Sequence, residues 1–368
     1  MMKLKRIILL IAFLPLLLCC GGKEPIHDLP APPTPVTPGG GDDEGGGDEG
    51  GGQTPAGEWE KNRGKVVTPS GTGWTTTKVR EGITFYKFTG TDPITKAAQN
   101  VCAIDVDLSN PDYAVQLTYT TPSATTSEVH KAHNAIATMN AGYEAGSIYI
   151  RVGNKNKSSL PNIEIGSTGV RNWKSEAGFF GDCNRTLSIK KAETLRRPYI
   201  SPESSEMSKF ISAERSFYYN STEPDIISSS PLLIYDYEPV GETFIDYSYP
   251  NWEKLNSEHP QYHQRYRHPR SAIAITENNH FIMMVVDGRQ TKSSHNPKAA
   301  GMSAKELTQF FVTNFNPQYA LNMDGGGSTA MCVEGLGNKD THIVDSPIQD
   351  NVPGKERARD THFIIVAK

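Results

Sequence analysis

Hydrophobic and polar residues alternate in short runs over most of the chain beyond residue 58. Alternation with a period of two predicts β-strands, and it recurs at residues 83–89, 101–108, 113–120, 147–152 and 231–235. Residues 271–276 and 280–286 are apolar enough to be buried strands. Because the strands are short and closely spaced, we expect an α+β domain with mixed, mostly antiparallel sheets and a few helices.

Two segments have helical periodicity instead. Residues 128–139 place apolar side chains near one face after Ser127, a plausible N-cap, and therefore predict a helix. A second helix is expected to follow Ser303, because Glu306 lies three residues later and completes a capping box.

The second predicted helix connects two predicted strands, one ending at Asp287 and the other at Asp324. Crossovers of this kind are right-handed and usually join parallel strands. If both strands lie in one sheet, the two aspartates leave the same sheet end. This arrangement makes Asp287 and Asp324 a candidate pair, although they are far apart in the sequence.

A glycine-rich motif follows the second of these strands and is formed by Asp324, Gly325, Gly326, Gly327, Ser328 and Thr329. Glycines allow backbone angles at which successive N–H groups point into one concavity, and such a nest attracts anions. The alternative is a simple hairpin turn with an acidic residue before it. Because three glycines exceed what a hairpin needs, the motif favours a ligand site.

Arginines that follow or precede strands are candidates for binding an anionic ligand. Pro269 fixes the backbone before Arg270, and Arg289 follows Asp287 and Gly288. A guanidinium group can bind phosphate or carboxylate through two parallel hydrogen bonds. The aromatic-rich residues 243–252 could line a sugar site or pack as a partly buried loop.

The N-terminus is typical of a secreted bacterial lipoprotein. Lys3, Lys5 and Arg6 precede an apolar run at residues 7–18, which is shorter than a membrane-spanning helix requires. The run ends in a sequence that resembles a lipoprotein cleavage box, with Cys20 as the predicted lipidated residue. Cys19 is the alternative site of lipidation. The alternative to a cleaved signal peptide is a signal anchor that is not cleaved. We expect residues 1–20 to be the signal peptide and the mature chain to be anchored in the outer membrane, facing the periplasm or the cell surface.

Residues 21–58 are rich in proline, glycine and acidic residues and have a net charge of −7. They contain too few apolar side chains to form a core and are predicted to be a disordered tether. Residues 59–368 are then expected to form one domain, and their charge is balanced. A balanced charge argues against a nucleic-acid-binding surface.

The cysteines of this domain, Cys102, Cys183 and Cys332, are odd in number, so at most one disulfide can form. The sequence contains no CxxC pairing, and we expect no resident metal or cofactor. A divalent ion held by Asp182, Asp287 and Asp324 is retained as an alternative.

Six motifs occur in an order and spacing that resemble the phosphodiester glycosidase domain family. They read NAGY, PRSAIAI, VDGR, GMSAKEL, ALNMDGGGSTAM and ERARDTHFIIV, and the resemblance covers about residues 135–366. The resemblance implies a surface cavity lined by the motif residues Asn140, Gly142, Arg270, Asp287, Arg289 and 324–329. The chain departs from the family pattern where Glu144 follows Tyr143, and at residues 193–230, which do not align.

The resemblance implies hydrolysis of the sugar–phosphate bond in a sugar-1-phosphodiester of the GlcNAc–phosphate–sugar type. Asp324 would act at the anomeric carbon, and Asp287 would support it or orient Arg289. The phosphate would bind to the glycine motif, Ser328, Thr329 and the arginines, while Asn140 would bind the sugar. The alternatives are a glycan-binding lipoprotein without turnover and a metal-dependent phosphodiesterase.

Overall fold

The computed structural model describes residues 59–160, 173–182, 186–192 and 216–368. The signal peptide, the tether and Cys20 therefore lie outside the described residues, as does Cys183. The described residues all belong to one compact unit.

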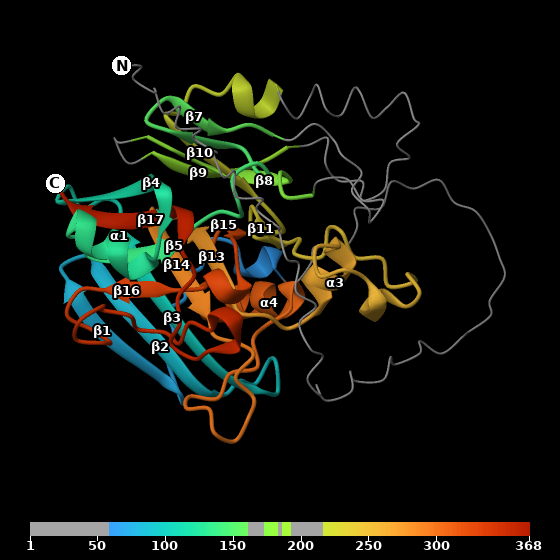
Figure 1. Ribbon diagram of the computed structural model, residues 1–368. Helices are drawn as coiled ribbons and strands as arrows, with labels where there is room; N and C mark the ends of the chain where they lie inside the picture. The colour runs from blue at the N-terminus through green and yellow to red at the C-terminus, as the bar shows by residue number, and fades with distance from the viewer. Residues whose placement is uncertain (1–58, 161–172, 183–185, 193–215) are drawn as a thin grey trace, which may run out of the picture. The chain divides into compact units, whose positions relative to one another are not determined.

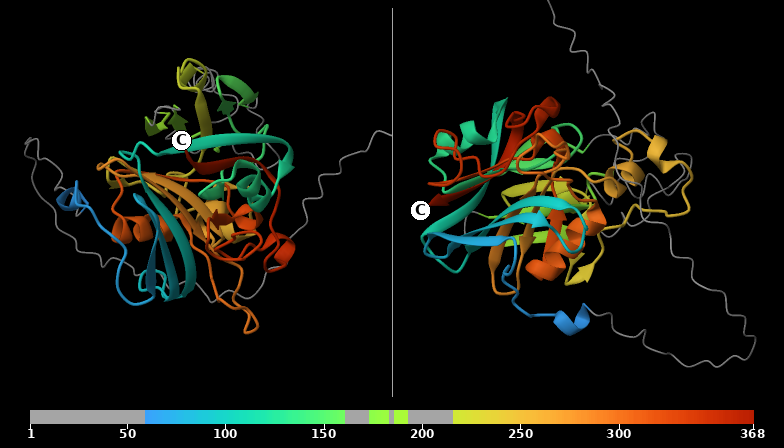
Figure 2. Two further views of the ribbon diagram at one scale, coloured as in Figure 1. Left: turned by 90° about the vertical axis from the view of Figure 1, so that its left-hand side faces the viewer. Right: turned by 90° about the horizontal axis from the view of Figure 1, so that it is seen from below.

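The largest sheet has eight strands in the order β1-β2-β3-β14-β13-β15-β11-β12 (Figure 1). Its strands span β1 Trp74–Arg80, β2 Ile83–Thr91, β3 Ala98–Asp107, β11 Leu232–Tyr235, β12 Glu238–Pro239, β13 Arg270–Ile275, β14 His280–Val286 and β15 Tyr319–Asn322. The two views of Figure 2 show this sheet twisting from its blue strands to its orange ones.

Two smaller sheets complete the β-structure. One has five strands in the order β7-β6-β10-β8-β9, and the other has four in the order β16-β5-β17-β4. Their strands span β4 Tyr113–Ala124, β5 Ala137–Asn140, β6 Ile150–Val152, β7 Lys155–Ser158, β8 Ala177–Gly181, β9 Leu187–Lys191, β10 Asp225–Ser229, β16 Met331–Val333 and β17 Arg359–Ala367.

The main hydrophobic core contains side chains from all three sheets, including Ile104, Phe179, Met283 and Phe363. The other face of the large sheet is covered by α4 (Ala304–Asn314), which buries Leu307, Phe310 and Phe311 against it. The predicted capping box of α4 is confirmed, with Ser303 as the N-cap and Glu306 returning the hydrogen bond. The other helices and 3-10 turns are η1 Glu60–Asn62, α1 Thr126–His133, η3 Trp252–Lys254, α3 Pro260–Arg265, η4 Gly326–Ser328 and η5 Gln349–Asn351.

The prediction of one helix over residues 128–139 is wrong in its second half. The helix α1 begins after Thr125, which is the N-cap in place of Ser127, and it ends at Asn134 in the left-handed conformation (φ 47°). Residues 137–140 instead form β5, which pairs with β16 and β17. Met139, one of the apolar residues that suggested a helix face, is buried because it lies in β5, and the buried Ile136 directly precedes that strand.

The prediction of parallel pairing across α4 also needs correction. Every pair of neighbouring strands in the three described sheets is antiparallel. The strands β14 and β15 run in the same direction, but β13 lies between them and pairs with both. Asp287 and Asp324 still leave the same sheet end, as the strand–helix–strand pattern predicts.

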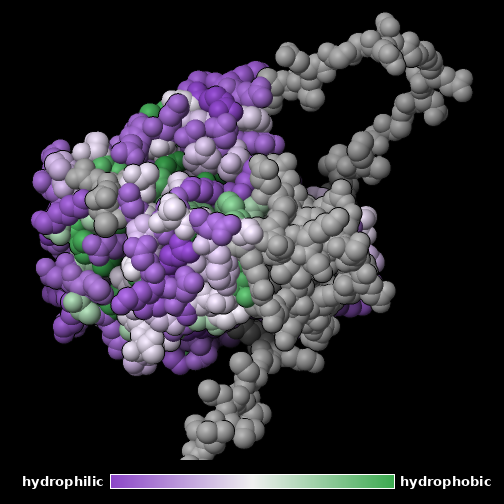
Figure 3. All heavy atoms as spheres, turned by 90° about the horizontal axis from the view of Figure 1, so that it is seen from above, coloured by the Kyte–Doolittle hydropathy of each residue, from purple (hydrophilic) through white to green (hydrophobic). Residues whose placement is uncertain are grey.

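Over the described part of the face shown in Figure 3, hydrophilic residues predominate and hydrophobic ones form small patches. Among the residues that the structure describes, no helix is both long and apolar enough to span a bilayer.

Candidate active site

Asp324 lies directly beyond β15, where the backbone leaves the large sheet and approaches β5 and β17. Its N–H donates to the carbonyl of Ala141 (3.0 Å), and its own carbonyl accepts from Asn140 Nδ2 (2.6 Å). The side chain is 12% exposed, and Oδ2 lies 2.9 Å from Nη2 of Arg359 at the start of β17. The sheet connection and the ion pair therefore hold the carboxyl group of Asp324 in place.

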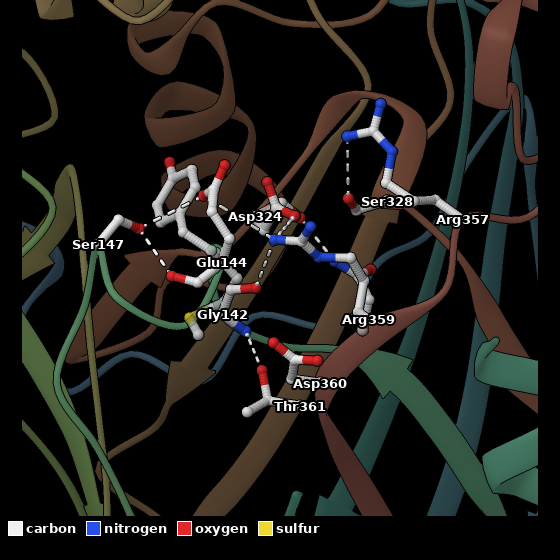
Figure 4. A network of polar contacts seen from close by, with 12 residues as sticks. Gly142, Glu144, Ser147, Asp324, Ser328, Arg357, Arg359, Asp360 and Thr361 are labelled. Carbon is white, nitrogen blue, oxygen red and sulfur yellow. Dashed lines mark hydrogen bonds and ion pairs between the residues drawn. The ribbon is translucent and has the colours of Figure 1, made fainter. Parts of the chain in front are cut away.

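Charges of alternating sign extend from Asp324 through Arg359 to Glu144 (Figure 4). The same Nη2 of Arg359 lies 4.0 Å from Oε2 of Glu144, and that oxygen is 3.4 Å from Nζ of Lys174. Lys174 is also 2.8 Å from Glu258 and lies 4.6 Å from the ring centre of Tyr143. Because Arg359 approaches both Asp324 and Glu144, two carboxyl groups share one cation.

The pKa values of Asp324 and Glu144 are shifted in opposite directions. Burial raises the pKa of Asp324, the charge of Arg359 opposes that rise, and the charge of Glu144 adds to it. Burial would also raise the pKa of Glu144, but the charges of Lys174 and Arg359 and hydrogen bonds lower it overall. A pair of acids with pKa values moved apart can divide the roles of acid and base.

The glycine motif forms the 3-10 turn η4, and it differs from the predicted nest. The N–H of Gly326 donates to the carbonyl of Pro269 (2.9 Å), so it is not available to a ligand. Ser328 and Thr329 are 0% and 1% exposed, which places them beneath the turn. Gly325 and Gly326 reach the surface, and among the described residues the N–H of Gly325 has no hydrogen-bond acceptor.

Two arginines flank this turn. A Cβ atom on Gly326 would lie 3.4 Å from Nη2 of Arg289, and one on Gly327 would lie 2.8 Å from Nη2 of Arg357. Arg357 donates to Gln349 Oε1 (2.5 Å) and Ser328 Oγ (3.4 Å), which are both neutral acceptors. Within the described ranges Arg357 has no ion pair with a carboxylate, so its charge is available to an anionic ligand.

Other predicted ligands are buried and contact the protein itself. Asn140 is 0% exposed, and its Oδ1 accepts from Ser271 Oγ (2.7 Å) and the N–H of Ala330 (3.2 Å). The N–H of Gly142 donates to Thr361 Oγ1 (2.9 Å). The expectation that Asn140 contacts the sugar therefore does not match this placement, in which Asn140 positions the backbone of Asp324.

Arg270 is 1% exposed, and its guanidinium group donates to the carbonyls of Met302 (2.9 Å), His263 (2.6 Å) and Tyr266 (3.0 Å). Burial lowers its pKa to about 10. These bonds attach the end of α3 to the large sheet. Any effect of Arg270 on a phosphate would thus be indirect, because the guanidinium group is buried and bonds three backbone carbonyls.

Asp287 is 1% exposed, and its carboxyl oxygens accept from Asn100 Nδ2 (2.5 Å) and the N–H of Ser346 (3.0 Å). Burial raises its pKa to about 6. The expected support of Asp324 or Arg289 by Asp287 does not match these contacts. Although Asp287 and Asp324 follow strands at the same end of the sheet, the carboxyl group of Asp287 is buried and accepts hydrogen bonds from Asn100 and Ser346.

Across the described part of the chain, no three His, Cys, Asp or Glu side chains are grouped as metal ligands. Asp182, Asp287 and Asp324 therefore do not form the three-carboxylate group that the metal-dependent alternative requires. Cys102 and Cys332 are buried, and both are free.

The sequence did not identify the charged residues around Asp324, which are Glu144, Lys174, Glu258, Arg357 and Arg359. Three of them had a usable signal. Glu144 directly follows the NAGY motif, and Arg357 and Arg359 lie in the last motif of the family pattern. Lys174 and Glu258 belong to connecting segments, and only the folded chain brings them together.

A model of the phosphodiester glycosidase family matches residues 133–366, which include every candidate active-site residue described above. A search of curated proteins finds no match. Solved structures share the fold at low identity. A hypothetical protein from Synechocystis is 13% identical with a TM-score of 0.52, and the match covers 81% of this chain and 64% of that one. This chain thus spans less than two thirds of that relative.

Two further structures are similar. The catalytic domain of zebrafish N-acetylglucosamine-1-phosphodiester alpha-N-acetylglucosaminidase, auto-inhibited by its pro-peptide, is 14% identical with a TM-score of 0.47, covering 82% of this chain and 86% of that one. A putative exported protein from Burkholderia pseudomallei is 11% identical with a TM-score of 0.48, covering 82% of this chain and 99% of that one.

Proposed function

The chain belongs to the phosphodiester glycosidase family, and from this we propose that it hydrolyses the sugar–phosphate bond of a sugar-1-phosphodiester. The observation that carries the proposal is the position of Asp324 between the Arg359–Glu144 pair and the arginine-flanked turn η4. Carboxyl groups and a phosphate site then adjoin each other, as cleavage between a sugar and a phosphate requires.

In the proposed reaction, water adds to the anomeric carbon and the bond from that carbon to the phosphate oxygen breaks. The products are a free sugar and a phosphomonoester. Asp324 attacks the anomeric carbon or deprotonates the attacking water, and Glu144 is the second carboxyl group of the site. The transition state resembles an oxocarbenium ion, which nearby carboxylates stabilise.

The phosphate is assigned to Arg289, Arg357 and the N–H of Gly325. Two guanidinium groups offset the charge that remains on the leaving group. A phosphate is a weak base, so its departure needs less proton donation than that of an ordinary sugar alcohol. This is why the pair of acids can serve mainly the sugar side of the bond.

The test is a product assay on GlcNAc-1-phosphodiesters with and without a chelator. We expect released GlcNAc in both conditions, and a loss of about 10²–10⁴-fold in kcat for Asp324→Asn. Asp360→Asn is the matched control, because it makes the same charge change one residue from Arg359 and should keep activity. Binding of the diester without release of sugar would favour a glycan-binding lipoprotein. Activity lost on chelation would favour a metal-dependent enzyme.

We further propose that the substrate is a glycan of the cell envelope, the diet or a host, and that the protein is anchored in the outer membrane through Cys20. The support is the charged N-terminal segment, its apolar run and the cleavage-box sequence. Labelling with a fatty-acid analogue should mark the wild type. The variant Cys20→Ala should be unlabelled and move to the soluble fraction; equal labelling of both would contradict the assignment.

A further inference from the structure

A contiguous set of aromatic rings extends from the phosphate side of the site along η3 and α3. We call it the aromatic platform, and it consists of Trp252, Tyr262, Tyr266 and His268, all partly exposed. The rings of Tyr262 and Tyr266 are 4.1 Å apart, those of Trp252 and Tyr266 are 5.1 Å apart, and His268 lies 6.1 Å from Tyr262 and 6.3 Å from Tyr266.

The platform is continuous with the proposed phosphate site through His268. Nδ1 of His268 is 3.5 Å from Nη2 of Arg289, whose guanidinium lies beside Gly326. Because arginine can only donate, Nδ1 must accept and the ring carries its proton on Nε2. Burial and the charges of Arg270 and Arg289 hold the pKa of His268 well below its ordinary value, so the ring is neutral.

Arginines also restrain two members of the platform. The guanidinium group of Arg265 lies 4.8 Å from the ring centre of Trp252 and 5.1 Å from that of Tyr247. The carbonyl of Tyr266 accepts from Arg270, which ties this residue to the large sheet. Rigid aromatic side chains lose little conformational entropy when they bind a ligand.

We infer, on the basis of the proposed function, that the aromatic platform binds the leaving group, and that this group is a sugar esterified to the far side of the phosphate. Contacts connect η4 through Arg289 and His268 to the tyrosines, so the platform adjoins the proposed phosphate site. Rings with hydroxyl and N–H groups suit a sugar, whose C–H faces stack on aromatic rings and whose hydroxyls form hydrogen bonds.

Two substrates that differ only in the leaving group test this inference. One is a GlcNAc-1-phosphate methyl diester, and the other carries a hexose in place of the methyl group. For Trp252→Ala and Tyr266→Ala we expect kcat/KM on the hexose diester to fall about tenfold, with the methyl diester changed less than about twofold. Tyr219→Ala is the matched control, since Tyr219 is 37% exposed and its ring lies 4.9 Å from that of Tyr149, which is not part of the platform.

If kcat/KM of the alanine variants falls equally on both diesters, or on neither, the platform does not bind the leaving group. The proposed function would still stand, because the wild type cleaves the diesters. If the wild type cleaves neither diester, the proposed function fails, and binding of the same two compounds is measured by calorimetry. A preference for the hexose diester that both alanine variants lose would then support the platform, and an unchanged preference would overturn it. Thermal melting of each variant identifies losses that come from unfolding.

Discussion

Removing the charge of Arg359 is the sharpest test of how Asp324 is held. The two side chains are 13% and 12% exposed and their charged atoms are 2.9 Å apart. In Arg359→Gln the carboxyl group of Asp324 loses its nearest cation but stays buried. Glu144, which already raises the pKa of Asp324, would then act unopposed by Arg359.

The magnitude follows from the burial of the pair. Breaking a buried ion pair by removing one partner costs about 3–5 kcal/mol. We expect the lower end, about 3 kcal/mol at pH 7, because Ser328 and Lys174 still stabilise the carboxylate. The folded-state pKa of Asp324 rises further in the variant, so the folded state binds more protons than the unfolded state above the ordinary pKa of an aspartate. The cost therefore grows as pH rises from about 4 and is smallest in acid.

The cost of breaking the Asp324–Arg359 pair is measured by urea denaturation at pH 7 and at pH 4.5. The proteins compared are the wild type, Asp324→Asn, Arg359→Gln and the double variant. A coupling free energy of about 2–3 kcal/mol is expected at pH 7, because the double variant leaves no unpaired buried carboxylate. Additive effects, or a cost in Arg359→Gln below about 1 kcal/mol at both pH values, would refute the reasoning.

Three other changes give distinct outcomes. Gly327→Ala places a Cβ atom 2.2 Å from Gln349 Oε1, so the end of that side chain must move. We expect kcat/KM on a sugar-1-phosphodiester to fall about tenfold with little change in Tm. An unaltered kcat/KM would count against the role of the turn η4. His362 is 0% exposed with no partner for either ring nitrogen in the described residues, and burial lowers its pKa to about 3. The unfolded state takes up this proton first as pH falls, so His362→Leu should reduce the stability lost between pH 7 and pH 4.5 by about 2–3 kcal/mol, as measured by urea denaturation. Arg270→Lys cannot reach the three carbonyls that the guanidinium group binds and should lower the free energy of unfolding by about 2–4 kcal/mol, seen as a lower midpoint of thermal unfolding.

The strands were largely predictable because their signals are local. Alternating or continuous apolar runs identified β2, β3, β4, β13, β14 and β15, and the capping box located the start of α4. Residues 128–139 were mispredicted because their apolar residues satisfy a helical period and a short buried strand equally well. The decisive feature was the left-handed Asn134, and an asparagine in that conformation is not specified by apolar periodicity.

The candidate site was predictable only in part because its charges come from distant segments. Asp324 and Arg289 follow strands, where side chains with chemical roles are expected. The cation that pairs with Asp324 is 35 positions away at Arg359, and the second carboxyl group is Glu144. Asn140 and Arg270 belong to the same motifs, but they contact backbone groups. A motif therefore identifies the neighbourhood of a site without separating ligands from the residues that position them.

The three glycines after Asp324 are needed for three different physical reasons. A Cβ atom on Gly325 would lie 2.5 Å from the carbonyl of Pro269, Gly326 has a φ of +61°, and a Cβ atom on Gly327 would lie 2.2 Å from Oε1 of Gln349 and 2.8 Å from Nη2 of Arg357. Only the second is a requirement of backbone conformation, while the other two are close approaches by other segments. The glycines thus let β13 and the arginines come close to Asp324. Because the N–H of Gly326 is already used, it is these arginines, far from the motif in sequence, that supply most of the attraction for an anion.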